Sequence, residues 1–291
     1  MQISAPLAYA GDPREAADSA AALESAGLDA VWVAEAYGFD SPTTMGYLAA
    51  RTERMKIGAA ILNVYSRTPA LIAQTAAGLD AVSGGRAIIG LGASGPQVVE
   101  GWHGKTYDRP LGRTRETIEL TRRILRREVI DHHGITDMPL PPEKGGRLGK
   151  PLKILTKPVR PEVPLYVASL GPANVRMTAE IADGWLPTLF LPEKAHQVWG
   201  APLAEGKEKR DPALGPLKEA ARIQELYLAG KKKEAEAAVP DEFCELMSLC
   251  GPAGYVRERV EAFRAAGVTM LNVIPVGPEP AKSIETVKGW L

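Results

Sequence analysis

Residues 25–36, SAGLDAVWVAEA, contain the end of a helix, a glycine and a buried strand. Gly27 suits the left-handed residue that often ends a helix, and the apolar run 28–34 is typical of a strand covered on both faces. The same order returns in RAAGVTMLNVIPV, residues 264–276, with Gly267 at the junction. This repeated order predicts βα units around a parallel sheet.

The pattern extends along the whole chain and predicts an α/β fold, a TIM-like (β/α)8 barrel formed by residues 1–291 as a single domain. A doubly wound sheet is the alternative, although the first glycine series comes later than a Rossmann fingerprint does. The predicted strands lie at residues 2–8, 28–34, 55–62, 86–91, 163–168, 184–189 and 269–275. The predicted helices lie at residues 13–26, 42–52, 69–82, 110–129, 172–182, 193–207, 217–229, 241–249 and 254–266.

A barrel needs one strand more than this pattern supplies. Between Phe190 and Thr269 the sequence indicates only helix and loop. We therefore expect a helical region, residues 193–266, that replaces or spans the unit of the seventh strand.

Composition narrows the class of protein. The 291 residues are 45% hydrophobic, and 35 basic side chains balance 35 acidic ones, so neither nucleic acid nor an anionic membrane is an expected partner. Two cysteines make no disulfide framework, and no apolar run approaches the roughly 18 residues of a membrane span. We expect a cytoplasmic protein.

Side chains and backbone groups that could bind a ligand follow several predicted strands. Backbone N–H groups are exposed after one predicted strand, at Gly92, Ala93, Ser94 and Gly95. This pattern indicates either a bound ligand, such as a phosphate or a flat cofactor, or only a tight turn. A second such turn leads from another predicted strand into a helix and consists of Ala168, Ser169, Leu170, Gly171 and Pro172. The free N–H groups at the start of a helix attract phosphate.

Other candidates are single side chains. Glu35 and Tyr37 could bind a ligand, or could cap a loop and pack on the rim. Asn63 and Arg67 could donate hydrogen bonds, and His103 is one of four histidines. No zinc-binding, P-loop or nucleophile-elbow motif occurs, so we expect no metal. A site of backbone donors and scattered hydroxyls suits a bound redox cofactor.

Several long segments carry a resemblance to a known family. The block from Ile57 to Val98 is followed in order by EGWHG (residues 100–104), PLGRTRETIEL (110–120) and VPLYVASLGPANVRMTAEIADGWLP (163–187). Together they resemble the luciferase-like monooxygenase superfamily, and most closely its coenzyme F420-dependent oxidoreductase branch of actinobacteria and archaea.

The resemblance implies a barrel with the cofactor at its carboxyl-terminal face. It also implies a non-proline cis peptide bond at Ala60–Ile61, behind the deazaflavin ring, and a phosphate held by residues 168–172. The cofactor contacts that it implies are Glu35, Ala60, Ile61, Asn63, Gly92, Ala93, Ser94, Gly95, Ala168, Ser169, Leu170, Gly171 and Pro172.

The sequence also departs from the family. Glu35 and Ala36 stand where its sugar-phosphate dehydrogenases have an Asp–His pair, which argues against activity on glucose 6-phosphate. The region between the sixth and eighth strands is roughly 50 residues shorter than the resemblance implies for this branch of the family, with the apparent deletion near Pro216–Lys218.

The resemblance implies hydride transfer between F420 and an unknown organic substrate, with the catalytic proton from Glu35, Tyr37, His103 or solvent. One alternative is an FMN-dependent monooxygenase. Another is a non-catalytic barrel, engineered or shortened, that has lost activity. The resemblance also implies a homodimer, because dimers are common in this family.

Overall fold

The computed structural model describes residues 1–8, 11–221 and 246–291. They form two compact units. The first unit consists of Met1–Ala5, Ser25–Asp29 and the described part of Ala168–Leu291, and the second of Pro6–Glu24 and Ala30–Val167, again without residues 9–10. The assignment of residues 1–291 to a single domain stays a prediction.

The second unit is built on parallel strands. β2 (Ala30–Val33) pairs with β3 (Lys56–Ala59), β3 pairs with β5 (Ala87–Gly92), and β5 pairs with β6 (Leu165–Val167). After β3 the chain passes through a cis peptide bond at Ala60–Ile61, as the resemblance implies, and continues as β4 (Leu62–Asn63) beside β5. Every residue of β2 and β5 is buried, which explains their continuous apolar sequence.

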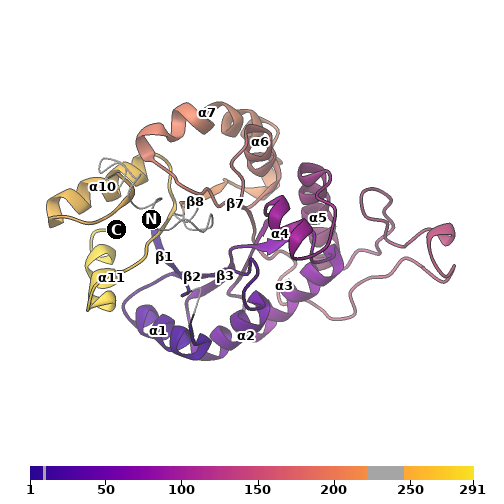
Figure 1. The fold of residues 1–291 in the computed structure, drawn as a ribbon, viewed down its shortest axis with the longest axis horizontal. Coiled ribbons are helices and arrows are strands. Elements are labelled where there is room, and N and C mark those ends of the chain that lie inside the picture. The colour runs from indigo at the N-terminus through magenta and orange to yellow at the C-terminus, as the bar shows by residue number, and fades with distance from the viewer. Residues whose placement is uncertain (9–10, 222–245) are drawn as a thin grey trace. The chain divides into compact units, whose positions relative to one another are not determined.

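The helices of the second unit follow the strands in an arc (Figure 1). Their starts match capping signals: the side chain of Asp40 accepts from the Thr43 N–H, and that of Thr68 from the Leu71 N–H, each before a helix with proline in its first turn. Gly84 ends one helix with a φ of 68°. The helices are α1 (Pro13–Ser25), α2 (Ser41–Arg51), α3 (Pro69–Ser83), α4 (Pro96–Gly101) and α5 (Pro110–Leu125).

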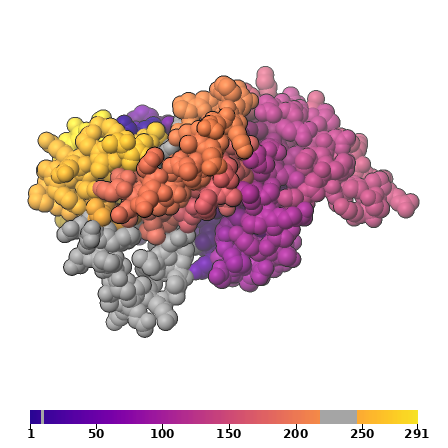
Figure 2. Space-filling view, turned by 90° about the horizontal axis from the view of Figure 1, so that it is seen from above, coloured from indigo at the N-terminus to yellow at the C-terminus, as the bar shows by residue number. Residues whose placement is uncertain are grey.

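An arm, residues 126–163, leaves the end of α5 and returns to β6, and it stands away from the rest of its unit in Figures 1 and 2. Within it are two isolated antiparallel bridges and the 3-10 helix η1 (Pro142–Lys144). Arg160 fixes its returning end: Nε and Nη2 lie 2.9 and 2.6 Å from the carboxylate of Asp80 on α3. Asp80 is completely buried.

The first unit also holds parallel strands. β1 (Gln2–Pro6) pairs with β9 (Met270–Asn272), β9 with β8 (Lys218–Ala221), and β8 with β7 (Gly184–Trp185). An aromatic cluster of Trp185, Phe190 and Trp199 forms much of its core. Its helices are α6 (Pro172–Ile181), α7 (Pro192–Glu208), the 3-10 helix η2 (Pro212–Leu214), α10 (Ala253–Ala265) and α11 (Pro280–Lys288).

The structure corrects the sequence analysis between Phe190 and Thr269. No strand was expected there, yet β8 occupies residues 218–221, where the helix 217–229 was predicted. Backbone pairing with β7 and β9 outweighs the helical preference of Lys-Glu-Ala-Ala. The remainder of that predicted helix and most of the helix 241–249 lie outside the described residues.

Two helices, α4 and α11, were not predicted, because each is short and starts at a proline inside a loop-like sequence. No helix in the described ranges is both long and apolar enough to cross a bilayer.

Glu24 at the end of α1 makes a testable contribution to stability. Its carboxylate accepts from the backbone N–H groups of Glu53, Arg54 and Met55 just before β3. Burial acts to raise its pKa, but these bonds, Met55 first, lower the pKa below the ordinary value. A lowered folded-state pKa means that the stabilisation is present at neutral pH and is lost as the pH falls through that pKa.

We therefore expect Glu24→Gln to lower the free energy of unfolding by about 1–3 kcal/mol at neutral pH. The difference from wild type should shrink below the ordinary carboxyl pKa of about 4. Urea unfolding at neutral and acid pH measures both values, with exposed Glu53→Gln as the control. If Glu24→Gln lowers the free energy of unfolding by the same amount at both pH values, the ionised carboxylate of Glu24 is not the source of the stabilisation.

Candidate functional site

Strand pairing in the second unit brings most of the predicted site residues to one edge. The N–H of Ala60 donates to the carbonyl of Val33 at 2.8 Å, and the N–H of Val64 donates to that of Gly92 at 3.1 Å. The carboxyl-terminal ends of β2, β4 and β5 therefore lie together. The predicted residues on, beside or just after these ends are Glu35, Tyr37, Ala60, Ile61, Asn63, Gly92, Ala93, Ser94 and Gly95, whereas His103 comes after the helix α4.

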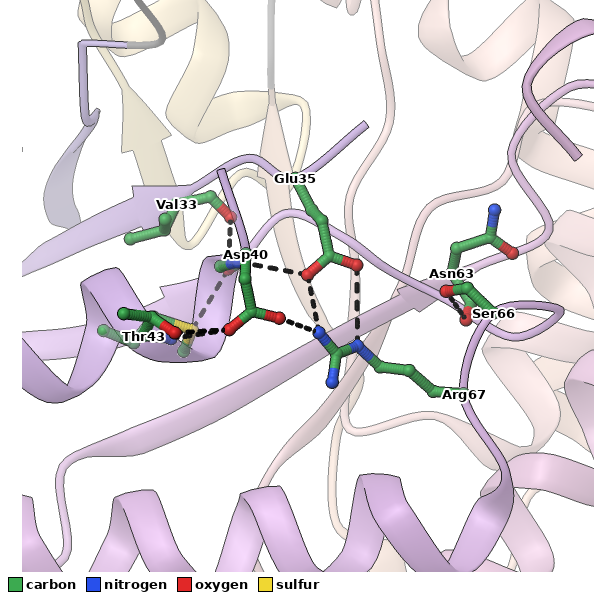
Figure 3. Close-up of polar contacts among 9 residues, drawn as sticks. Val33, Glu35, Asp40, Thr43, Asn63, Ser66 and Arg67 are labelled. Atoms are coloured by element: carbon green, nitrogen blue, oxygen red, sulfur yellow. Dashed lines mark hydrogen bonds and ion pairs between the residues drawn. The ribbon is translucent and has the colours of Figure 1, made fainter. Parts of the chain in front are cut away.

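Glu35, two residues after β2, is turned toward Arg67, which comes from the loop between β4 and α3 (Figure 3). Arg67 Nη2 lies 2.9 Å from Glu35 Oε2, and the same oxygen accepts from the Ser41 N–H at 3.1 Å. Arg67 also pairs with Asp40, the N-cap of α2. One guanidinium thus joins the loop after β2 to the loop after β4.

The charges in this cluster are mutually satisfied. Burial raises the pKa of Asp40, but hydrogen bonds from Thr43 and Arg67 outweigh it and hold that pKa below its ordinary value. For Arg67, burial lowers the pKa, and the bonds to Glu35 and Asp40 raise it overall. Glu35 in this arrangement holds Arg67 in place, because its carboxylate oxygens accept from the Arg67 guanidinium and from the Ser41 N–H.

Asn63 presents a buried donor. It is 6% exposed, and its Oδ1 accepts from the Tyr65 N–H at 2.8 Å. Its Nδ2 has no hydrogen-bond partner in the part of the chain that the structure describes, and in Figure 3 its side-chain amide is turned away from Ser66 and Arg67. A buried N–H without a partner is costly, so this atom favours a bound acceptor.

The glycine series lies beside Asn63, since Asn63 and Gly92 are partners in the β4–β5 register. Gly92 is buried, whereas Ala93, Ser94 and Gly95 are partly or fully exposed. Ser94 adopts a left-handed conformation with a φ of 57°. The edge here is made of backbone and small side chains, so a flat ligand could approach the main chain.

A tyrosine pair connects these two parts of the edge. The rings of Tyr65 and Tyr107 stack with centroids 5.3 Å apart. The Tyr107 hydroxyl donates to the Ser94 carbonyl at 3.2 Å, and the Tyr65 hydroxyl to the Asp108 carbonyl at 2.7 Å. Burial raises the pKa of both phenols, so both stay protonated donors at neutral pH.

The remaining predicted side chains lie farther out. Tyr37 is 52% exposed and packs against Trp102, with ring centroids 6.4 Å apart, as expected for a residue on the rim. His103 is half-buried, and among the described residues its Nε2 has no hydrogen-bond partner.

Residues 168–172 belong to the first unit. The Ser169 hydroxyl is bonded to Thr178 at 2.8 Å, and the indole N–H groups of Trp185 and Trp199 donate to the carbonyls of Ser169 and Leu170. Gly171 is the N-cap of α6. These bonds fix the turn and occupy the Ser169 hydroxyl. An anion at this turn would therefore accept hydrogen bonds from the backbone N–H groups and not from the Ser169 side chain.

Sequence reasoning missed three residues of the edge, Asp40, Tyr65 and Tyr107. Asp40 was detectable, because Asp40 before Ser41 and Pro42 is a helix-start signal. Tyr107 had no such signal, since its bond to Ser94 joins a loop to a turn 13 residues away.

A parallel α/β protein with its candidate site at the carboxyl ends of the strands belongs to a large class of enzyme folds. The sequence model of one family in this class, luciferase-like monooxygenase, matches residues 1–218. The chain belongs to the luciferase-like monooxygenase family and has its TIM-barrel fold.

Individual relatives agree with this assignment. The chain is 32% identical to a Mycobacterium tuberculosis protein provisionally named as a coenzyme F420-dependent oxidoreductase, over 98% of each chain. That alignment spans 339 positions, so part of the relative has no counterpart among these 291 residues. The chain is 27% identical to 5,10-methylenetetrahydromethanopterin reductase of Archaeoglobus fulgidus, over 91% of this chain and 90% of the relative.

The fold is also found in a solved structure. An F420-dependent secondary alcohol dehydrogenase, in complex with an F420-acetone adduct, superposes with a TM-score of 0.80 at 20% identity, over 100% of this chain and 98% of the other.

Proposed function

We propose that this protein is an oxidoreductase that binds coenzyme F420 at the carboxyl-terminal edge of β2, β4 and β5 and transfers a hydride between F420 and a small organic substrate. The observation that carries the proposal is the unpartnered Nδ2 of Asn63 beside the backbone-lined turn 92–95. The names of relatives at 32% and 27% identity support it.

The residues of the edge fit a flat ring with polar edges. Ala60 and Ile61 form the cis peptide beside Val33, Gly92 to Gly95 leave room at the backbone, and Asn63 supplies a buried donor. We propose separately that the turn 168–172 of the first unit can hold a phosphate group through its backbone N–H groups. When bound, F420 supplies or accepts a hydride at its deazaflavin ring.

The chain's own residues would orient the two reactants and exclude water. Glu35 holds Arg67 and thereby the loop after β4. We leave proton delivery to Tyr37 or His103, because neither has its polar group in an ion pair among the described residues. A small-molecule substrate, a homodimer and a cytoplasmic location complete the proposal, and light scattering of the purified protein tests the dimer.

A fluorescence titration of the purified protein with F420, and separately with FMN, tests the choice of cofactor. We expect saturable binding of F420 and little binding of FMN. Tight FMN binding would favour a monooxygenase instead. Binding of neither would favour a barrel that has lost its activity.

The tyrosine pair supplies a sharper test. Tyr107→Phe keeps the stack on Tyr65 but removes the bond to the Ser94 carbonyl, so we expect F420 affinity to fall by about threefold to tenfold with the unfolding midpoint nearly unchanged. Tyr47→Phe makes the same chemical change on α2 and serves as the control. Equal affinity in the Tyr107 variant would show that the turn needs no such support.

A further inference from the structure

The arm, residues 126–163, contains a segment whose charges are all positive. Residues 145–159, GGRLGKPLKILTKPV, hold four cationic side chains and no carboxylate. These cations are Arg147, Lys150, Lys153 and Lys157; all four are exposed, and none of their side chains has a hydrogen bond or an ion pair within the described ranges. The balanced net charge of the chain argued against an anionic partner, but it conceals this local excess.

The cations on either side of the segment are already paired. Lys144 Nζ lies 2.8 Å from a carboxylate oxygen of Asp137, and Arg160 is bonded to Asp80. These two pairs hold the arm to itself and to α3. The four cations between them are therefore available to an anionic partner, and they are not needed to hold the arm in place.

The same segment exposes large apolar side chains. Leu148 and Leu155 are 90% and 94% exposed, and Leu152 and Val159 are 65% and 61% exposed. The arm stands away from the rest of its unit (Figures 1 and 2). Single exposed apolar residues are ordinary, but four of them on one projecting segment indicate a surface that another body covers.

Cations and leucines alternate along the segment, which suits the surface of an anionic lipid bilayer. Lysine and arginine attract and reach the headgroup phosphates, while neighbouring leucines enter the boundary between the headgroups and the acyl chains. Leu148 follows Arg147 directly, and Leu152 precedes Lys153, so both kinds of contact can form in one encounter.

Other occupants fit the segment less well. A nucleic acid would leave the leucines without a partner, and residues 145–159 contain no aromatic side chain on which a base could stack. Lysine is depleted at the centres of protein–protein interfaces, and three of the four cations are lysines. The same segment of a second copy would meet it with like charges.

We propose that residues 145–159 dock the protein on an anionic lipid surface, with the four cations at the lipid phosphates and with Leu148 and Leu155 inserted between the headgroups. The contact is peripheral, because no helix in the described part of the chain could cross a bilayer.

Sedimentation with lipid vesicles tests the proposal, and it needs no cofactor, so its result is independent of F420 binding. One set of vesicles is phosphatidylcholine alone, and the other is an equal mixture of phosphatidylcholine and phosphatidylglycerol. We expect binding to the mixture, at least about tenfold weaker binding to phosphatidylcholine, and a loss of binding as the salt concentration rises. Equal binding to both sets, or binding to neither, would overturn the proposal.

Two double variants locate the contact. Lys150→Gln with Lys153→Gln should weaken binding to the anionic vesicles by about tenfold or more, whereas Lys194→Gln with Lys209→Gln, the same change at exposed positions of α7 and its C-cap, should not. Leu148→Ser with Leu155→Ser leaves the charge unchanged and should weaken binding by about tenfold, with Leu71→Ser on α3 as the control. Unchanged binding in either arm variant would overturn the proposal.

Two further measurements distinguish the other occupants. If light scattering shows that Leu148→Ser with Leu155→Ser dissociates an oligomer of the wild-type protein, a second copy covers the segment and the lipid contact is wrong. A DNA duplex that binds as tightly as the anionic vesicles, and loses its binding in the lysine variant, would also overturn the proposal. We expect neither result.

Discussion

Asn63→Asp lowers the affinity for F420 by about 10-fold to 100-fold, which is the expected cost of removing one buried donor from a polar partner. Aspartate keeps the oxygen that accepts from the Tyr65 N–H but replaces the Nδ2 donor with an acceptor. The affinity is measured by fluorescence titration. The substitution tests the observation on which the proposed function depends.

The control for this variant is Gln74→Glu, the same amide-to-carboxylate change on an exposed position of α3. Thermal unfolding without cofactor shows whether the Asn63 variant is folded. A folded variant with wild-type affinity would mean that Nδ2 does not face the cofactor, and the ring would have to be placed elsewhere on the edge.

Local signals predicted much of this fold. Gly27, Gly84 and Gly267 end helices with positive φ values of 97°, 68° and 93°, as their places before apolar runs indicate. The strand β2 lies within its predicted range and β5 extends one residue past its own, to Gly92, because residues buried on both faces leave a continuous apolar sequence. The family and its cis peptide at Ala60–Ile61 are confirmed.

Features that depend on distant partners were not predictable. Residues 218–221 form a strand only because β7 and β9 offer backbone partners on both sides, and nothing in Lys-Glu-Ala-Ala indicates this. In the candidate site, sequence reasoning selected Glu35 and Asn63 as ligand contacts. Their roles differ once side chains are placed: Glu35 is paired with Arg67, whereas Asn63 keeps an unused donor.

Arg160→Ala should lower the free energy of unfolding by about 3–5 kcal/mol, the cost of leaving a buried charge without its partner. Asp80 is completely buried, and Arg160 supplies two of its hydrogen bonds while also donating to the Ala87 carbonyl at 3.0 Å. Removal of the Arg160 side chain therefore breaks the hydrogen bonds that join the returning end of the arm to α3 and to the start of β5. Urea unfolding measures the change.

The double variant Arg160→Ala with Asp80→Asn separates the charge from the packing. Because asparagine is uncharged, the double variant should be more stable than Arg160→Ala alone, although each single substitution destabilises the protein. Lys157→Ala, at an exposed position of the same arm, should have little effect. If the two single losses simply add, Arg160 stabilises the arm through its aliphatic contacts, and the buried ion pair is not what joins the arm to α3.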